Sequence, residues 1–174
     1  MSQSVFCIVP TTAKANEIIG NLEIAGIGKA DISVLLPDRS GTRDFAHEAH
    51  TKLPEGTAVG AASGGVVGGA LGLLAGIGLL AIPGLGPFIA AGPIMAALSG
   101  MAVGATIGGV TGALIGLGMP ELEAKRYEGK LKEGNVLISA HASSADDVKR
   151  VKNVFERAGA TDISVSSETP VASR

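Results

Sequence analysis

The stretch GTAVGAASGGVVGGALGLLAGIGLL, from Gly56 to Leu80, opens a long run of the chain that carries no charge. From Gly56 to Pro120 there is no Asp, Glu, Lys, Arg or His, although charged residues make up 17% of the 174 residues. We therefore expect the middle of the chain to lie in an apolar environment. Within it glycine recurs at every fourth position in two series, which are Gly60, Gly64, Gly68, Gly72 and Gly76, and then Gly100, Gly104, Gly108, Gly112 and Gly116.

The four-residue step of these glycines is typical of glycine zippers. Residues four apart lie on one face of an α-helix, so each series predicts a smooth groove in which another helix can pack closely. Between the series, the prolines and glycines of IPGLGPF (Ile82 to Phe88) break a helix, and Pro93 suits the first turn of the next one. The sequence therefore predicts a helical hairpin over 57–119, with helices over 57–81 and 94–118.

The hairpin can be placed in two ways. Each predicted helix has about 25 residues, which is long enough to cross roughly 30 Å of hydrocarbon at about 1.5 Å per residue. Glycine and alanine, however, fill many positions where leucine normally drives insertion, and glycine weakens an isolated helix. The hairpin therefore either spans a membrane with tight helical partners, or lies buried inside a soluble homo-oligomer that exposes only the flanking regions.

The first flank, residues 1–37, is predicted to form a β-α-β unit. The β-branched run Ser4 to Val9 is a strand closed by Pro10, and Thr11 or Thr12 can cap the following helix. The apolar residues of that helix recur at helical spacing and are Ala15, Ile18, Ile19, Leu22 and Ala25. A second strand runs from Asp31 to Leu36 and stops at Pro37.

The second flank, residues 135–167, repeats this pattern. A strand from Asn135 to Ala140 is followed by a capping-box start at Ser144 and Asp147, and by a helix that buries Val148, Val151, Phe155 and Ala158. A last strand runs from Asp162 to Ser167.

The tetrapeptide DISV occurs in both flanks, at 31–34 and at 162–165, with equal spacing back to Val5 and to Val136. This internal repeat predicts that the two halves form one sheet. The predicted fold class is α+β: a ferredoxin-like split β-α-β repeat, with one four-stranded antiparallel sheet and two helices on one face, interrupted by the glycine-zipper hairpin.

Three further segments complete the domain organisation. Residues 38–56 are predicted to be a polar linker, residues 120–134 an amphipathic helix that leaves the hairpin, and residues 168–174 a disordered tail. The exit helix has Pro120 at its start, acids in its first turn and bases later, as the helix dipole favours. Its bases are the candidates for contact with anionic head groups at a membrane surface, namely Lys125, Arg126, Lys130 and Lys132.

Charge and composition exclude some partners and indicate where the flanks lie. A net charge of −2 and a pI near 5.9 argue against a nucleic-acid partner, because no basic stripe can neutralise phosphates. The single Cys7 lies in an apolar run and is predicted to be a buried, unreactive thiol. The first residues lack the basic start and long apolar core of a secretory signal, so we expect the flanks to stay in the cytoplasm.

No constellation of residues predicts catalysis or a cofactor. His47, Glu48 and His50 are the candidates for a metal site, with Asp44 and His141 as possible additions. HExH lacks the helical spacing of the zincin motif, so we interpret these residues as polar side chains on the surface. The group Glu121, Glu123, Tyr127 and Glu128 is explained more simply as part of a charged collar than as acid–base machinery. The glycines match no nucleotide-binding motif. We therefore predict no catalytic residue, no cofactor and no metal.

Four features together resemble a known family. These are the β-α-β start, the segment FAHEAHTKLPEG (45–56), the turn IPGLGPFIAAGP (82–93) and the exit GMPELEAKRYEGKLKEGNVLISAHA (118–142). The combination resembles bacterial general-stress proteins of the heat-induced glycine-zipper type, over about Val5 to Val165. The resemblance implies a stress association and a membrane-like centre, and it brings no enzymatic activity or catalytic residue.

We therefore expect a non-enzymatic, stress-associated protein that assembles with itself through its zippers, associates with membrane or lipid and displays cytoplasmic ferredoxin-like domains. In a bacterial inner membrane, two spans would leave both termini in the cytoplasm, because the basic residues occur only in the flanks. Two alternatives stay open: a membrane-anchored sensor that binds a small ligand between the β-α-β halves, and a cytoplasmic homo-oligomer with the hairpins buried inside.

Overall fold

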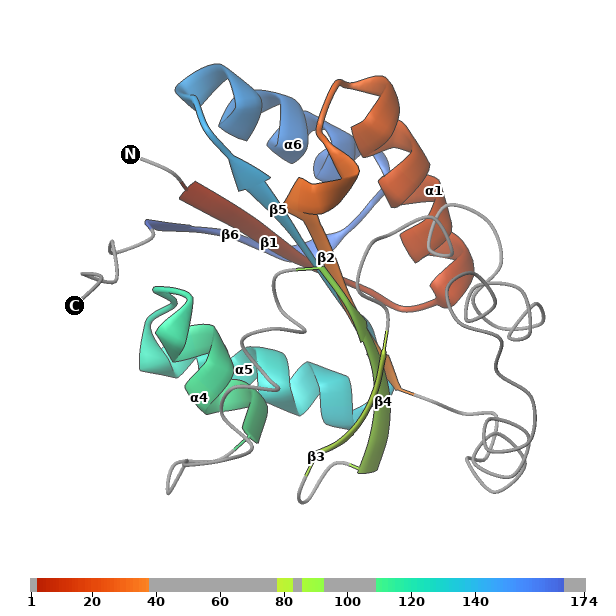
Figure 1. Cartoon of the computed structure of the whole chain (residues 1–174), viewed down its shortest axis with the longest axis vertical. Coiled ribbons are helices and arrows are strands. Elements are labelled where there is room, and N and C mark those ends of the chain that lie inside the picture. Colours follow the sequence, from red (N-terminus) through yellow and green to blue (C-terminus); the bar gives the residue numbers. More distant parts are fainter. Residues whose placement is uncertain (1–2, 38–77, 83–85, 93–108, 168–174) are drawn as a thin grey trace, which may run out of the picture.

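The computed structural model describes residues 3–37, 78–82, 86–92 and 109–167. Across these ranges the protein is a mixed α+β structure with one antiparallel sheet in the order β3-β4-β2-β5-β1-β6 (Figure 1). The elements are β1 (Gln3–Val9), α1 (Thr12–Ile24), the 3-10 turn η1 (Lys29–Asp31), β2 (Ile32–Pro37), β3 (Gly78–Ile82), β4 (Gly86–Ala91), α4 (Gly109–Gly116), α5 (Glu121–Lys132), β5 (Val136–Ala142), α6 (Ala145–Arg157) and β6 (Thr161–Ser167).

The first β-α-β unit agrees with the sequence analysis to within one or two residues. The hydroxyl of Thr11 accepts a hydrogen bond from the backbone N–H of Lys14 at 3.2 Å and so caps α1. The apolar face of α1 is fully buried through Ala15, Ile18, Ile19 and Leu22. The helix ends at Ala25 because Gly26 adopts a φ of +88°, which favours glycine.

The second unit begins in the predicted way. The Ser144 hydroxyl accepts a hydrogen bond from the Asp147 N–H at 3.1 Å and donates one to the Asp147 carboxylate at 2.7 Å, which fixes the start of α6. Val151 and Phe155 are fully buried and Val148 is partly buried. The predicted helix and its cap are therefore confirmed.

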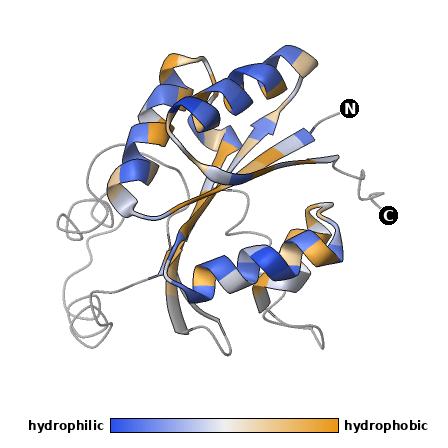
Figure 2. Ribbon diagram, turned by 180° about the vertical axis from the view of Figure 1, so that it is seen from behind, coloured by the Kyte–Doolittle hydropathy of each residue, from blue (hydrophilic) through white to orange (hydrophobic). Residues whose placement is uncertain are grey.

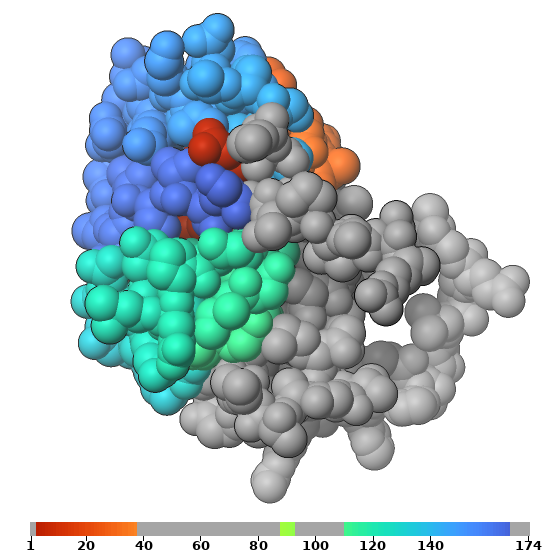
Figure 3. Space-filling view, turned by 90° about the vertical axis from the view of Figure 1, so that its left-hand side faces the viewer, coloured from red at the N-terminus to blue at the C-terminus, as the bar shows by residue number. Residues whose placement is uncertain are grey.

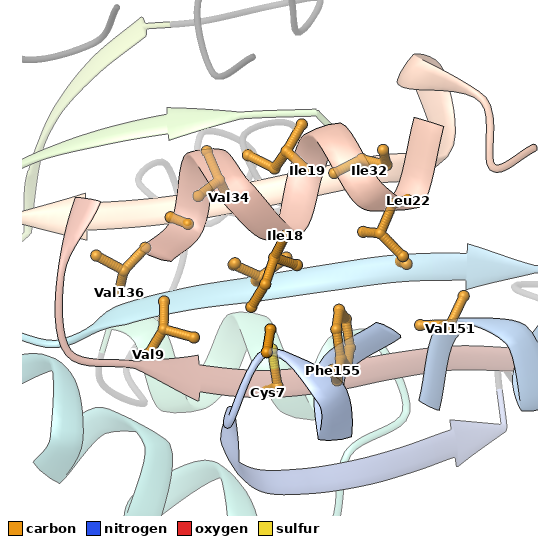
Figure 4. Packing of buried hydrophobic residues seen from close by; sticks show 14 of the residues in the cluster. Cys7, Val9, Ile18, Ile19, Leu22, Ile32, Val34, Val136, Val151 and Phe155 are labelled. Carbon is orange, nitrogen blue, oxygen red and sulfur yellow. The ribbon is translucent and has the colours of Figure 1, made fainter. Parts of the chain in front are cut away.

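The strands of the two units interleave in one sheet. Strand β1 lies between β5 and β6, and β5 lies between β1 and β2, with every pairing antiparallel. Helices α1 and α6 cover one side of the sheet, called here the α1/α6 face (Figure 1). The core under them draws on both halves of the chain, since Cys7, Ile18 and Val34 pack in the same cluster as Phe155 (Figure 4). The prediction of one antiparallel α+β sheet is confirmed.

The opposite side of the sheet is also covered, which the sequence analysis did not predict. Helices α4 and α5 lie against it, and this side is called here the α4/α5 face (Figure 1). Phe6, Ile8, Leu35 and Leu137 point to this side and pack with residues of both helices, among them Tyr127. The strands are mainly hydrophobic, whereas α5 and α6 carry many hydrophilic residues (Figure 2). The fold therefore has three layers, with the sheet between two pairs of helices.

The exit helix predicted over 120–134 is present as α5. Pro120 occupies the cap position, Glu121 and Glu123 lie in the first turn, and the chain leaves through Gly134 at a φ of +90°. The predicted linker over 38–56 and the tail over 168–174 lie outside the described residues.

The hairpin prediction is wrong where the structure describes its centre. Residues 78–81 were expected to end the first helix and 82–88 to be a turn, but these residues form β3 and β4, which pair from Gly78↔Ala90 to Ile82↔Gly86. Strand β4 then pairs with β2 from Val34↔Ala91 to Pro37↔Phe88. The breakers do reverse the chain, but the edge of β2 offers backbone hydrogen bonds to a strand. The competing helix is weakened because glycine lowers helix stability by about 1 kcal/mol per residue.

The remaining hairpin prediction rests largely on residues that the structure does not describe, 57–77 and 93–108. The last part of the second helix is present as α4, with eight residues. Among the helices of the described ranges, none has the length and apolar character needed to cross a membrane.

Candidate functional site at the junction of the apolar segment and the sheet

Helix α4 is where the uncharged segment joins the folded sheet. Val110, Ala113 and Leu114 are fully buried against α5 and the α4/α5 face of the sheet. The other side of α4 exposes Ile115, whose exposed fraction is 38%, and Gly116, where an added Cβ would meet nothing within 4 Å. Apart from the buried Thr111, helix α4 is therefore apolar both where it packs and where it is exposed.

Of the ten glycines predicted to form zippers, two lie in the described residues. Gly112 is buried within α4, and Gly116 ends it on the exposed side. The other eight lie outside the described residues, namely Gly60, Gly64, Gly68, Gly72, Gly76, Gly100, Gly104 and Gly108. Close packing of the zippers stays a prediction.

A carboxylate connects α4 to α5. The Thr111 hydroxyl donates a hydrogen bond to the side chain of Glu128, whose other oxygen lies 2.8 Å from the Lys132 ammonium. Burial raises the pKa of Glu128, but the hydrogen bonds from Lys132 and Thr111 outweigh burial and hold the pKa below its usual value. The ionised carboxylate therefore ties the last turns of the apolar segment to a helix of the folded domain.

The turn after α4 packs closely against strand β6. Gly118 adopts a φ of +89°, and a Cβ at this position would lie 2.5 Å from the Ser167 carbonyl oxygen and 3.0 Å from the Ser166 hydroxyl. Only glycine fits both the backbone conformation and the available space. Met119, the next residue, is buried in the same core as α4. Gly118 and Met119 therefore both hold this turn against the folded domain.

Tyr127 holds α5 on the sheet. Its hydroxyl donates a hydrogen bond to the Asp162 carbonyl and lies 3.2 Å from the Ser164 hydroxyl, while its ring meets Phe6 edge-on with centroids 6.3 Å apart. Burial raises the pKa of Tyr127, so its hydroxyl stays protonated at neutral pH, as expected for an anchor.

Glu121, at the start of α5, lies in a different environment. The hydrogen bond from Lys125 keeps the pKa of Glu121 below its usual value, so Glu121 is ionised at neutral pH, as expected for a surface ion pair.

The four bases predicted to meet a membrane surface all lie on α5, and each has an acidic neighbour. Lys125 pairs with Glu121 at 2.7 Å, Lys130 with Glu133 at 3.5 Å, and Arg126 with Asp162 at 3.7 Å. Lys132 pairs with Glu128, as described above. Exposed pairs of this kind contribute about 0.2 to 1 kcal/mol each, so they can exchange partners readily. The membrane-surface role of these residues stays a prediction.

The candidate metal residues are not brought together in the described part of the chain. His47, Glu48 and His50, with Asp44, lie outside it, and His141 lies on β5 facing the α4/α5 side. Within the described ranges, no three His, Cys, Asp or Glu side chains cluster as a metal site requires. Cys7 is buried in the α1/α6 core, and burial raises its pKa, as the sequence analysis expected of an unreactive thiol.

A group of serines on the α4/α5 face was missed by the sequence analysis. Ser4 lies between His141 and Ser166 in the strand register, and Ser33 lies opposite Ser139. The side chain of Ser166 is 3% exposed, and its hydroxyl has no hydrogen-bond partner within the described structure. A buried hydroxyl without a partner costs about 1 to 3 kcal/mol.

The sequence did carry a signal for these serines. In each of the four strands of the two units, serine alternates with the apolar residues of the α1/α6 core, and the DISV repeat places Ser33 and Ser164 at equivalent positions. The apolar residues dominate these strands, so the pattern indicates buried strands more strongly than it indicates a polar second face.

Comparison of the chain with protein-family models, with curated proteins and with solved structures finds no match. Function is therefore inferred from the residues and geometry of the chain itself, and the stress association from the resemblance described in the sequence analysis.

Proposed function

We propose that this protein is a non-enzymatic, stress-associated scaffold that assembles with itself and associates with lipid through its glycine-rich apolar segment. The observation that carries the proposal is the docking of α4, which buries Val110, Ala113 and Leu114 on the sheet and leaves Ile115 and Gly116 on its outer side. A surface helix normally turns polar residues outward. An outer side without polar residues favours contact with a second apolar surface.

The folded domain is proposed to be a ferredoxin-like unit. The strand order β2-β5-β1-β6, with antiparallel pairing and two helices on the α1/α6 face, is the order that two interleaved β-α-β units require. Strands β3 and β4, contributed by the apolar segment, extend this sheet beyond β2. The apolar segment therefore leaves from this domain and returns to it.

We propose a bacterial inner membrane as the site of action, with both termini in the cytoplasm and the chain itself as its partner. A cytoplasmic homo-oligomer with the apolar segments buried inside is the alternative. The absence of charge from Gly56 to Pro120 supports both the membrane and the homo-oligomer, because an uncharged stretch of this length needs an apolar neighbour.

Vesicle flotation and light scattering of the purified full chain test the proposal. We expect the wild type to form particles larger than a monomer and to float with vesicles of phosphatidylethanolamine and phosphatidylglycerol. Large particles that float mean lipid association, whereas large particles that stay at the bottom mean the soluble assembly. A monomer that stays at the bottom with and without vesicles would overturn both forms of the proposal.

A second candidate is a sensor that binds a small ligand, and the buried Ser166 hydroxyl without a partner favours it. The hydroxyls on the α4/α5 face can donate and accept hydrogen bonds but carry no charge. Thermal-shift screening of small polar metabolites tests this role, and Ser166→Ala should abolish any shift. A shift that persists in Ser166→Ala would place the ligand elsewhere.

A further inference from the structure

Strand β6 is the edge of the sheet on the side away from β3. Among the described strands it pairs with β1 only. It reaches the surface as a band between α6 and the pair α4 and α5 (Figure 3). Residues 162–165 are half-buried, Ser166 is buried beside the Gly118 turn, and Thr161 and Ser167 are exposed. An edge strand of this kind presents unpaired backbone N–H and carbonyl groups to its surroundings.

The two ends of β6 differ in how they are protected. At the start, Asp162 has a φ of +50°, and the register with β1 shifts between Phe6 and Ile8, as in a bulge. The Asp162 carbonyl accepts the hydrogen bond of Tyr127, and its carboxylate pairs with Arg126. From Ile163 to Ser167 the strand has no Lys, Arg or Pro, which are the residues that natural proteins use to block an edge.

Two copies of β6 that pair antiparallel would place compatible side chains opposite each other. If two copies of β6 pair antiparallel about an axis at Ser164, then Ile163 of one copy faces Val165 of the other on the α1/α6 side. On the α4/α5 side, Ser164 faces the same residue of the second copy, and Asp162 faces Ser166. Apolar residues meet apolar residues, the acid meets a hydroxyl, and no like charges oppose each other.

The apolar side of this pairing is incompletely covered within one copy. Ile163 and Val165 are only partly buried against the α1/α6 core, and so are Val148 and Val154 of α6. A second copy would complete the burial of Ile163 and Val165 because each would gain a cross-strand neighbour. A two-fold contact also uses the same surface on both copies, so one self-matching strand suffices.

From these observations we propose that β6 is the contact between two copies of this chain, paired antiparallel about Ser164 to make one continuous sheet. This contact goes beyond the glycine zippers and does not require them. It gives the assembly two independent kinds of contact, one through the folded domain and one through the apolar segment.

Cysteine cross-linking tests the register directly. Two residues that face each other across antiparallel strands have Cα atoms about 4.5 to 5.5 Å apart, within the range of a disulfide. Ser164→Cys should therefore form a covalent dimer when diamide oxidises the two thiols and takes up their hydrogens. The matched control is Ser167→Cys on the same strand, which the proposed register holds roughly 20 Å from its copy, at about 3.3 Å per residue. The native Cys7 is buried in both variants, so it should not cross-link.

We expect the Ser164→Cys chain to be mostly dimeric on a non-reducing gel and the Ser167→Cys chain to be monomeric. No dimer in Ser164→Cys, or equal cross-linking in both, would overturn the proposal. Adding Val165→Lys to Ser164→Cys should slow cross-linking at least tenfold, whereas adding Ile24→Lys, at a fully exposed position on α1, should not. Equal rates in these two would also count against β6.

The same experiment in a Gly108→Ile background separates the two kinds of contact. The Ser164→Cys chain should still cross-link there, even if the particles become smaller. Loss of the cross-link would mean that it arises from the zipper assembly, and the β6 contact would then be rejected while the proposed function stands.

Discussion

Phe155 of α6 and Cys7 of β1 lie in the same buried cluster, although they belong to opposite ends of the chain (Figure 4). Both side chains are fully buried. Replacement of Phe155 by alanine should therefore loosen the half that contains Cys7 as well as its own. Removal of a buried phenylalanine side chain costs about 3 to 5 kcal/mol, because the lost burial and the remaining cavity both count.

Cys7 provides the assay because it is the only cysteine in the chain. Its thiol reacts with a labelling reagent only when the core opens, so the labelling rate follows the opening equilibrium. A loss of about 3 to 5 kcal/mol corresponds to roughly 10² to 4 × 10³ times faster labelling, at about 1.4 kcal/mol per factor of ten. Labelling of Phe155→Ala should be compared with Leu122→Ala, whose side chain is 83% exposed and whose change should matter by less than about 0.5 kcal/mol.

A shared core is excluded if Phe155→Ala destabilises only the C-terminal half. In that case amide exchange would accelerate in α6 and β6 while the labelling rate of Cys7 stayed at the wild-type value. Such a result would mean that the two β-α-β units unfold independently in spite of their interleaved strands.

Three further results are expected. Gly68→Ile and Gly108→Ile should reduce particle size in light scattering without reducing vesicle flotation, because isoleucine blocks close helix contact but raises hydrophobicity; unchanged particles in both would exclude glycine packing as the organising contact. Tyr127→Phe should lower the free energy of unfolding by about 1 to 2 kcal/mol in urea titration, because the Asp162 carbonyl loses its donor while the ring is kept. The folded-state pKa of Glu128 is lowered, so its contribution to stability is present above its unfolded pKa of about 4.3 and is lost as the pH falls through the folded value. Glu128→Gln should therefore show a smaller loss of stability than the wild type between about pH 5 and pH 3, and parallel curves would contradict the Thr111 contact.

The two β-α-β units could be predicted because their signals are local. Thr11 and Ser144 cap their helices, Gly26 and Gly159 end them, and the apolar residues between them recur at helical spacing. The DISV repeat added information at long range, since it indicated that the two halves share a sheet. Signals of this kind act within a few residues or recur in the sequence itself, so they can be recognised without the structure.

The predictions that failed for the middle of the chain depend on contacts between residues far apart in the sequence. Leu79 and Leu80 fit an apolar helix as well as a strand, and the decision between them depends on the free edge of β2, about forty residues earlier. The docking of α4 depends on Phe6, Ile8 and Leu137, which are spread over the whole chain. The alternation of serine with apolar residues is visible in the sequence, but only the register shows that Ser4, Ser166 and His141 are neighbours.

The position of β1 between β5 and β6 has a consequence for the order of events during synthesis. The first unit leaves the ribosome early, but both sheet neighbours of β1 belong to the last third of the chain. At about 5 to 20 residues per second, roughly 7 to 26 s separate the appearance of β2 from that of β6. During this interval the whole uncharged segment emerges while the sheet is still open. Helix α4 therefore leaves the ribosome before α5 and β5, which complete the core around it, so its docking has to wait until the last third of the chain has been made.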